Sequence, residues 1–264
     1  MPADERATFL MYHELRLPGR PIVSEEPGYA RYVVSRDAFE RQMRSLADGG
    51  WQGVSVSEWQ AGPGPADSVV ITFDDGAETD LEAAAPVLET LGQTATFFLT
   101  VDFLGRPGFM TRAQARQLAE RGQEVGCHSM SHAYLDDLEP GALEREIAGA
   151  KRELEDIVGR AVTAFSCPGG RVTPQAVEVA RRAGFKSVAT SEARRNSRTD
   201  SPWSLGRVAI LDQTTDAQVL SYAEGRGVAR QRLRASVFNA GKRILGNRLY
   251  EAVRGRLLGG SDPG

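Results

Sequence analysis

The chain has 264 residues, of which 41% are hydrophobic and 25% are charged, and its formal net charge is -3 at pH 7. This balance is typical of a globular protein and excludes a disordered or collagen-like chain. No apolar run approaches the roughly 20 residues needed to cross a bilayer. The start of the chain carries acids and lacks the basic opening of a signal peptide, and two cysteines cannot form a disulfide framework. We therefore expect a cytoplasmic location.

Short apolar segments alternate with amphipathic helical segments, which predicts βα units around a parallel sheet or barrel, an α/β fold. The expected strands are 7–12, 53–56, 68–73, 94–101, 124–127, 164–167, 186–190 and 207–210. The expected helices are 36–48, 79–91, 111–121, 140–158, 174–183 and 216–224. We predict a main domain at 1–215 and a basic helical extension at 216–264.

Two adjacent carboxylates, Asp74 and Asp75, directly follow the expected strand 68–73. The carboxyl ends of barrel strands are where active sites lie. Neighbouring acids that face different ways can divide the work, since one can bind a metal while the other takes a proton. A plain Asp-Asp-Gly turn is the alternative interpretation.

Two of the three histidines, His128 and His132, stand four residues apart after the expected strand 124–127. This spacing lets both imidazoles face one ion. Together with one carboxylate they would leave coordination positions open for water and substrate, as in a catalytic site. Solvated or buried histidines without a metal are the alternative.

A third segment, 165–171, contains the Cys167-Pro168-Gly169-Gly170 turn after another expected strand. Glycine allows unusual backbone angles and close approach of a ligand. Gly169 could therefore offer its N-H to an oxyanion beside Pro168, although a plain turn is an equal alternative.

These three motifs, in this order, resemble the polysaccharide deacetylase family, also called carbohydrate esterase family 4. The resemblance covers roughly residues 7–210 and implies a distorted (β/α) barrel of the polysaccharide deacetylase type. It implies that Asp74 is the general base and that Asp75, His128 and His132 bind a divalent metal. Zinc is the expected metal, with cobalt and nickel as alternatives.

The chain departs from the family pattern at two places. Ser166 stands where most members have an arginine, and no histidine follows His132 to act as the general acid. The resemblance is to the circularly permuted branch, which includes deacetylases of β-1,6-linked N-acetylglucosamine exopolysaccharide and has its catalytic histidine near the N-terminus. It implies that His13 is the acid, with a purely structural histidine as the alternative. Arg171 and Arg207, each beside an expected strand end, are the candidates to orient Asp74, although structural ion pairs would explain either.

The predicted activity is hydrolysis of the acetamide of N-acetylated amino sugars in a poly- or oligosaccharide, with release of acetate. A metal-dependent hydrolase of a non-sugar amide or imide, and a catalytically impaired glycan-binding barrel, are the alternatives. The basic, amphipathic tail could contact an anionic membrane, giving access to a lipid-linked glycan, or could pack on the barrel. No recognisable nucleic-acid-binding motif accompanies its charge.

Overall fold

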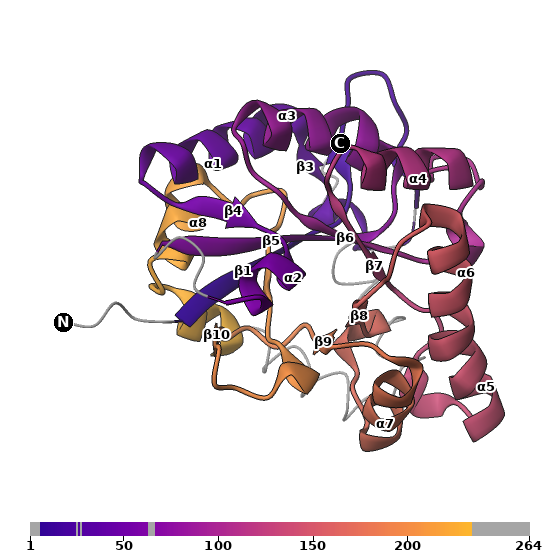
Figure 1. Ribbon diagram of the computed structural model, residues 1–264. Coiled ribbons are helices and arrows are strands. Elements are labelled where there is room, and N and C mark those ends of the chain that lie inside the picture. Colours follow the sequence, from indigo (N-terminus) through magenta and orange to yellow (C-terminus); the bar gives the residue numbers. More distant parts are fainter. Residues whose placement is uncertain (1–5, 25, 27, 63–66, 234–264) are drawn as a thin grey trace, which may run out of the picture.

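The computed structural model describes residues 6–24, 26, 28–62 and 67–233. Among these residues, a curled nine-stranded sheet forms the centre and helices cover its outer face (Figure 1). The strand order is β10-β1-β5-β6-β7-β8-β9, with β4 also beside β5 and β11 beside β1. The pairing is parallel throughout except between β1 and β10. The expected distorted (β/α) barrel is confirmed.

All eight expected strands are present. The sheet contains Arg6–Tyr12 (β1), Gln52–Val54 (β4), Ser68–Asp75 (β5), Thr96–Leu99 (β6), Glu124–Cys127 (β7), Ala164–Ser166 (β8), Ser187–Ala189 (β9), Arg195–Ser197 (β10) and Val208–Ala209 (β11). A separate parallel pair contains Leu15–Arg16 (β2) and Val34–Ser35 (β3). The strands β2, β3 and β10 were not predicted, because each contains at most one apolar residue and shows no apolar run.

Among the described residues, all six expected helices are present, and one further α-helix was not predicted. The α-helices are Arg36–Asp48 (α1), Val56–Gln60 (α2), Ala85–Thr90 (α3), Arg112–Glu120 (α4), Pro140–Glu144 (α5), Ala150–Val158 (α6), Pro174–Ala183 (α7) and Asp216–Ala223 (α8). Two π-helical segments, Asp80–Ala84 (η2) and Arg145–Gly149 (η5), interrupt the second and fourth expected helices. The helix that was not predicted is α2. Ser55 and Glu58 form a capping box that starts this helix, so the expected strand 53–56 is wrong at its end.

Alternation along β5 determines which side chains enter the barrel. Val69, Ile71 and Phe73 join the large core between sheet and helices, whereas Val70 joins a second cluster with Phe9 and Phe98. Since side chains alternate along a strand, Asp74 follows Val70 on the interior face. The interior is therefore apolar around Val70 and becomes polar at the carboxyl ends of the strands.

The segment 205–209 closes the gap between β9 and β1. The Leu205 N-H donates to the Val188 carbonyl at 2.8 Å, and Val208 and Ala209 pair with β1. Arg207 lies in this closing segment and is fully buried. Its side chain is thereby placed in the wall of the barrel.

The packed body continues past residue 215, where the boundary of the main domain was expected. Val219 and Ala223 of α8, and Val228 beyond it, belong to the main core. The Gln231 side chain donates to the Ala209 carbonyl at 2.6 Å. The first part of the predicted extension is thus packed on the barrel, and its remainder, 234–264, lies outside the described residues.

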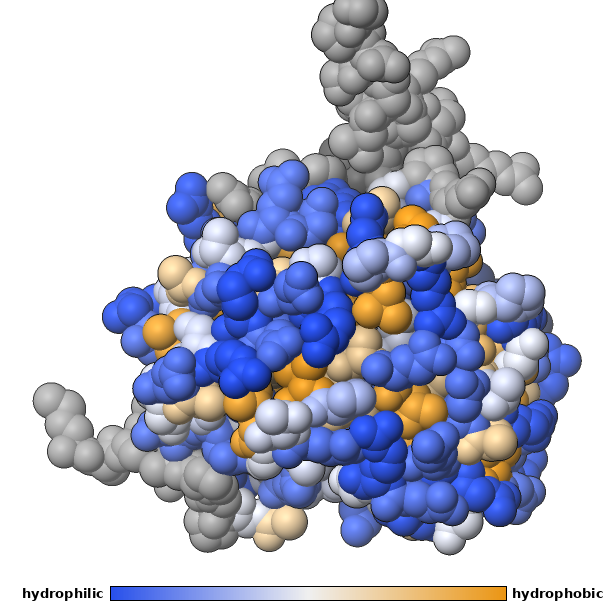
Figure 2. Space-filling model, turned by 90° about the horizontal axis from the view of Figure 1, so that it is seen from above, coloured by the Kyte–Doolittle hydropathy of each residue, from blue (hydrophilic) through white to orange (hydrophobic). Residues whose placement is uncertain are grey.

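Viewed from above, after a 90° turn from the orientation of Figure 1, the surface carries mainly hydrophilic side chains, with apolar residues visible in the hollows between them (Figure 2). Within the described part of the chain, no helix is both long enough and apolar enough to cross a bilayer.

Candidate active site

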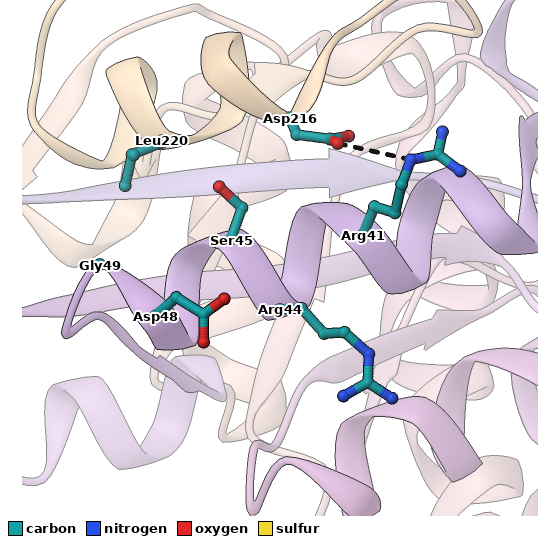
Figure 3. A pocket seen from close by; sticks show the side chains of 7 residues that line it. All are labelled: Arg41, Arg44, Ser45, Asp48, Gly49, Asp216 and Leu220. Carbon is teal, nitrogen blue, oxygen red and sulfur yellow. Dashed lines mark ion pairs between the residues drawn. The ribbon is translucent and has the colours of Figure 1, made fainter.

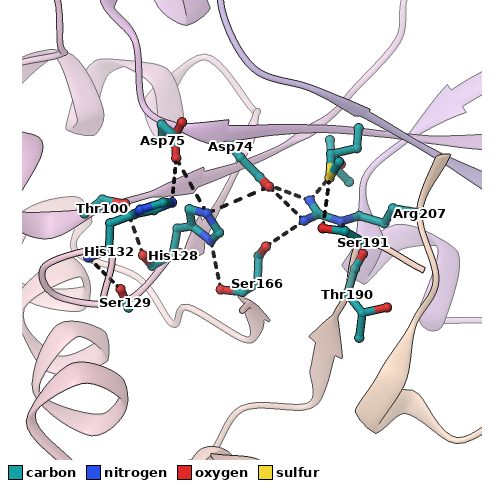
Figure 4. A network of polar contacts seen from close by, with 12 residues as sticks. Asp74, Asp75, Thr100, His128, Ser129, His132, Ser166, Thr190, Ser191 and Arg207 are labelled. Carbon is teal, nitrogen blue, oxygen red and sulfur yellow. Dashed lines mark hydrogen bonds and ion pairs between the residues drawn. The ribbon is translucent and has the colours of Figure 1, made fainter. Parts of the chain in front are cut away.

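Three predicted metal ligands converge at the carboxyl ends of β5 and β7 (Figure 4). Asp75 Oδ1 lies 3.5 Å from His128 Nε2 and 3.4 Å from His132 Nε2. This carboxylate oxygen is buried and has no hydrogen-bond partner among the described residues. A divalent cation would satisfy it, since two imidazoles and one carboxylate are a common donor set for zinc. The three residues therefore fit a metal ion.

His128 is held in the form that binds a metal. Its Nδ1 lies 2.8 Å from the Ser166 carbonyl, which requires the proton on Nδ1 and leaves the lone pair of Nε2 facing Asp75. Burial lowers the pKa of His128 to about 4, despite the opposing charge of Asp74. The imidazole is consequently neutral at pH 7.

Left-handed backbone turns shape the ligand loop. Among the described residues, the non-glycine positions with positive φ are Asp75 (81°), Ser129 (67°) and His132 (65°). Such conformations are uncommon outside glycine and cluster at functional sites. All three lie in the ligand set or in the loop between its histidines.

Asp74, the predicted base, is held by Arg207. The guanidinium donates from Nη1 to Oδ1 at 2.7 Å and from Nη2 to Oδ2 at 2.8 Å. Oδ2 also lies 3.9 Å from His128 Nε2, so it faces the ligand cluster. Burial by itself would raise the pKa of Asp74, but the charge and hydrogen bonds of Arg207 outweigh it and hold this pKa well below its ordinary value. Asp74 is therefore ionised and able to accept a proton.

Arg207 has its own set of hydrogen-bond acceptors. It donates to Ser166 Oγ at 2.8 Å, to the Thr190 carbonyl at 3.0 Å and to Thr72 Oγ1 at 3.2 Å. Ser166, the position at which the chain lacks the usual arginine, thus binds an arginine that arrives from the closing segment.

Of the two arginines expected as partners of Asp74, the structure brings only Arg207 to it. The structure pairs Arg171 with Asp136, whose Oδ2 is 3.3 Å from Nη1, and the guanidinium stacks on the Tyr134 ring at 4.1 Å. The expectation that Arg171 orients Asp74 is therefore wrong, because its guanidinium binds Asp136 and Tyr134 instead.

Residues 61–188, which include both carboxylates and both histidines of the cluster, match the polysaccharide deacetylase family model. These residues therefore form a polysaccharide deacetylase domain. A domain of this kind places the chain among hydrolases that act on carbon-nitrogen bonds.

Similar proteins cover most of the packed body. YxkH of Bacillus subtilis, itself a candidate polysaccharide deacetylase, is 28% identical over 196 residues, or 72% of this chain and 70% of YxkH. A chitooligosaccharide deacetylase of Azorhizobium caulinodans is 28% identical over 165 residues, or 60% of this chain and 74% of the relative. The crystal structure of BC0361, a polysaccharide deacetylase from Bacillus cereus, superimposes on this chain with a TM-score of 0.73. The match covers 83% of this chain and 69% of BC0361, with 25% sequence identity.

His13, the predicted acid, lies at the end of β1 on the same rim as the family motifs. Its ring packs against Tyr32 at 4.8 Å, and its buried Nδ1 has no hydrogen-bond partner within the described part of the chain. Tyr12 and Phe73, which directly precede His13 and Asp74, are partners in the parallel pairing of β1 with β5. The structure thus brings His13 to the region of the base, while its catalytic role and the circular permutation stay predictions.

Pro168 and Gly169 form a tight turn after β8. Gly169 has φ 63°, and a Cβ there would lie 2.6 Å from Tyr134 Cε1. Tyr134 follows His132 by two residues, so this close contact packs the turn against the ligand loop. Glycine is needed both for the left-handed angle and for the contact.

A separate surface hollow lies between α1 and α8 (Figure 3). Arg41 and Asp216 pair across it at 3.4 Å. It contains none of the clustered ligands or their partners, so the chemistry belongs at the strand ends.

Sequence reasoning missed Glu146, which contacts the ligand loop from η5. Its carboxylate accepts hydrogen bonds from the backbone of Met130 and Ser131. No local pattern distinguishes it from the other acids of the expected helix 140–158. The partner of Asp74 left a clearer signal, because Ser166 stands where most family members have an arginine and another arginine was therefore expected to replace it.

Proposed function

We propose that this enzyme removes N-acetyl groups from the amino sugars of an oligo- or polysaccharide by metal-assisted hydrolysis. The observation that carries the proposal is a buried base, Asp74, aligned by Arg207 beside three residues that fit a divalent cation. The name of the Azorhizobium relative, a chitooligosaccharide deacetylase, supports an N-acetylated glycan as the substrate.

Asp75, His128 and His132 would hold the cation. Zn²⁺ is the first choice, and Co²⁺ or Ni²⁺ are alternatives, because imidazole suits all three. The bound cation would supply Lewis-acid polarisation of the acetamide carbonyl and activation of water.

Asp74 takes the proton of the attacking water. Each of its oxygens accepts one hydrogen bond from Arg207. A carboxylate oxygen has a second acceptor site, so Oδ2 can take a proton on the side that faces His128. Arg207 therefore orients the base without occupying it fully.

Two further residues act on the acetamide group itself, one on its oxygen and one on its nitrogen. The Gly169 N-H, in the turn beside the ligand loop, donates to the oxyanion that forms on the carbonyl oxygen when the acetyl carbon is attacked. His13 donates a proton to the departing sugar nitrogen, which leaves as a neutral amine only once it is protonated. Acetate and a free amino sugar result.

For the tail we propose contact between residues 234–264 and an anionic membrane surface in the cytoplasm, which would bring a lipid-linked glycan to the site. The support is the charge and apolar pattern of the sequence. Binding to anionic vesicles should fall when the chain is cut after Leu233, a position that keeps the core residue Val228. Equal vesicle binding by both forms would remove the proposal.

The test of the activity is acetate release from N-acetylglucosamine oligomers by the Zn²⁺-loaded chain, beside a chelator-treated sample. We expect acetate and free amine in equal amounts, and only with metal. Turnover of a panel of non-sugar amides and imides, with none of the oligomers, would favour the alternative hydrolase. Binding of oligomers without turnover would favour a glycan-binding barrel.

A further inference from the structure

The loop from His128 to His132 has an unfavourable backbone that something must hold in place. Ser129 and His132 both have left-handed angles, with φ 67° and 65°. Side chains with a Cβ rarely adopt this region, and such conformations persist where surrounding contacts enforce them. The separation of the two imidazoles depends on this loop keeping its shape.

One side of the loop is held by the segment after β6. The Val101 N-H donates to the Ser129 carbonyl at 3.3 Å, and the Asp102 N-H donates to the Met130 carbonyl at 2.8 Å. These bonds occupy carbonyl groups of the loop. They leave its N-H groups at Met130 and Ser131 to be satisfied from elsewhere.

Glu146 holds the opposite side. Its Oε2 accepts from the Met130 N-H at 3.1 Å and from the Ser131 N-H at 2.8 Å, while Oε1 accepts from Ser131 Oγ at 2.8 Å. The Glu146 carbonyl also accepts from the Met130 N-H at 3.0 Å. Glu146 thus binds the two residues midway between the histidines.

The carboxylate depends on the loop in return. The Glu146 side chain is 1% exposed, and its ion pair with Arg145 spans 3.7 Å to a guanidinium whose side chain is 71% exposed. A buried carboxylate needs close donors, and the loop supplies three of them. Glu146 also lies in a π-helical segment, and such bulges occur often at functional sites.

We infer that Glu146 is a positioning residue for the metal centre, which fixes the distance between His128 and His132 by binding the backbone of their loop. This inference rests on the metal site of the proposed function. Its contribution comes from hydrogen-bond geometry, so an uncharged side chain of the same shape can replace it. In Glu146→Gln, the amide oxygen can accept from the two N-H groups while the amide nitrogen donates to Ser131 Oγ.

The test is the Zn²⁺ dissociation constant of the metal-free full chain, measured by competition with a chromophoric chelator. Glu146→Leu should weaken Zn²⁺ binding by about 10- to 100-fold, the usual effect of losing a residue that supports a metal ligand, whereas Glu146→Gln should stay within about threefold of wild type. Should Glu146→Leu fail to fold, Glu146→Asp decides the matter. Its shortened carboxylate keeps the charge but withdraws from the loop, so it should bind Zn²⁺ more weakly than Glu146→Gln.

Glu124 provides the matched control. It is a partly buried acid at the opposite end of β7, where it accepts from the Ser57 N-H and from Thr96 Oγ1. Glu124→Leu should lower the denaturant midpoint yet leave Zn²⁺ affinity within about threefold of wild type, because it supports no ligand.

The possible results separate the two claims. Wild-type affinity in Glu146→Leu, or in Glu146→Asp if only that variant folds, would overturn the role of Glu146 alone. An equal loss in Glu124→Leu would also overturn it, because general destabilisation would then explain the effect. Absence of Zn²⁺ binding by wild type would reject the metal centre and this inference together.

Discussion

The Arg207 guanidinium donates to both oxygens of Asp74, at 2.7 and 2.8 Å, across 133 residues of sequence. Both side chains are buried, and the arginine comes from the segment that closes the barrel. The alignment of the proposed base therefore depends on closure of the fold.

Replacing Arg207 should impair the chemistry more than substrate binding. Lysine cannot form the two parallel hydrogen bonds, so in Arg207→Lys the Asp74 carboxylate loses its fixed orientation. We expect kcat to fall by about 10²-fold, since small misplacement of a catalytic group has effects of this size, with KM nearly unchanged. Steady-state kinetics with acetate detection would measure this. Arg171→Lys, at the Asp136 ion pair, should behave like wild type; equal losses in both variants would contradict the assignment.

His13 should be needed for amides and dispensable for activated esters. An amine must be protonated as it leaves, whereas the phenolate of p-nitrophenyl acetate leaves without help. His13→Ala should therefore lose about 10²- to 10⁴-fold in glycan deacetylation, the usual contribution of a general acid, while retaining most ester hydrolysis. If both activities fell together, His13 would have a structural or binding role instead.

Replacement by alanine should destabilise the protein more at Gly169 than at Gly159, which has a similar backbone angle. Gly159 has φ 69° with open space around it, so Gly159→Ala should cost about 1–2 kcal/mol of unfolding free energy for the left-handed backbone alone. Gly169→Ala adds the 2.6 Å clash with Tyr134, which should cost about 1–3 kcal/mol more. Denaturant unfolding would compare the two, and the added Tyr134→Ala substitution should recover part of the difference. Equal costs at both glycines would show that the turn has room to relax.

The metal-free protein should lose stability in mild acid through His128. Burial lowers its pKa from 6.5 to about 4, against the charge of Asp74, so the unfolded chain binds this proton at a higher pH than the folded one. The contribution is fully present above pH 6.5 and is lost as the pH falls toward 4; it amounts to about 3 kcal/mol. With a chelator present, the unfolding free energy of His128→Asn should fall less steeply with decreasing pH over this range than that of wild type. An unchanged slope would count against a neutral, buried His128.

The sequence predicted the part of the site that local pattern and parallel topology determine together. Asp74 and Asp75 end β5 and His128 directly follows β7, so an α/β fold brings them to one rim without further information. Arg207 and Arg171 could not be separated in this way, because each adjoins a strand end. Only the pairing of segment 205–209 with β9 and β1 determines which guanidinium reaches Asp74.

Other differences have local causes. The helix α2 was missed because the capping residue Ser55 also fitted the end of an apolar strand. The short strand β10 pairs antiparallel with β1, which the βα rhythm does not anticipate. Glu146 was missed because its partners are backbone N-H groups of a loop, and these leave no pattern in a sequence.

The central claim is that Asp74 acts as a base beside a bound metal. Its most direct test is acetate release from N-acetylglucosamine oligomers by wild type and Asp74→Asn, with Zn²⁺ content determined in the same samples. We predict that the variant retains Zn²⁺ through Asp75, His128 and His132 while its rate falls by about 10²- to 10⁴-fold. A metal-loaded Asp74→Asn variant that releases acetate at the wild-type rate would contradict the account.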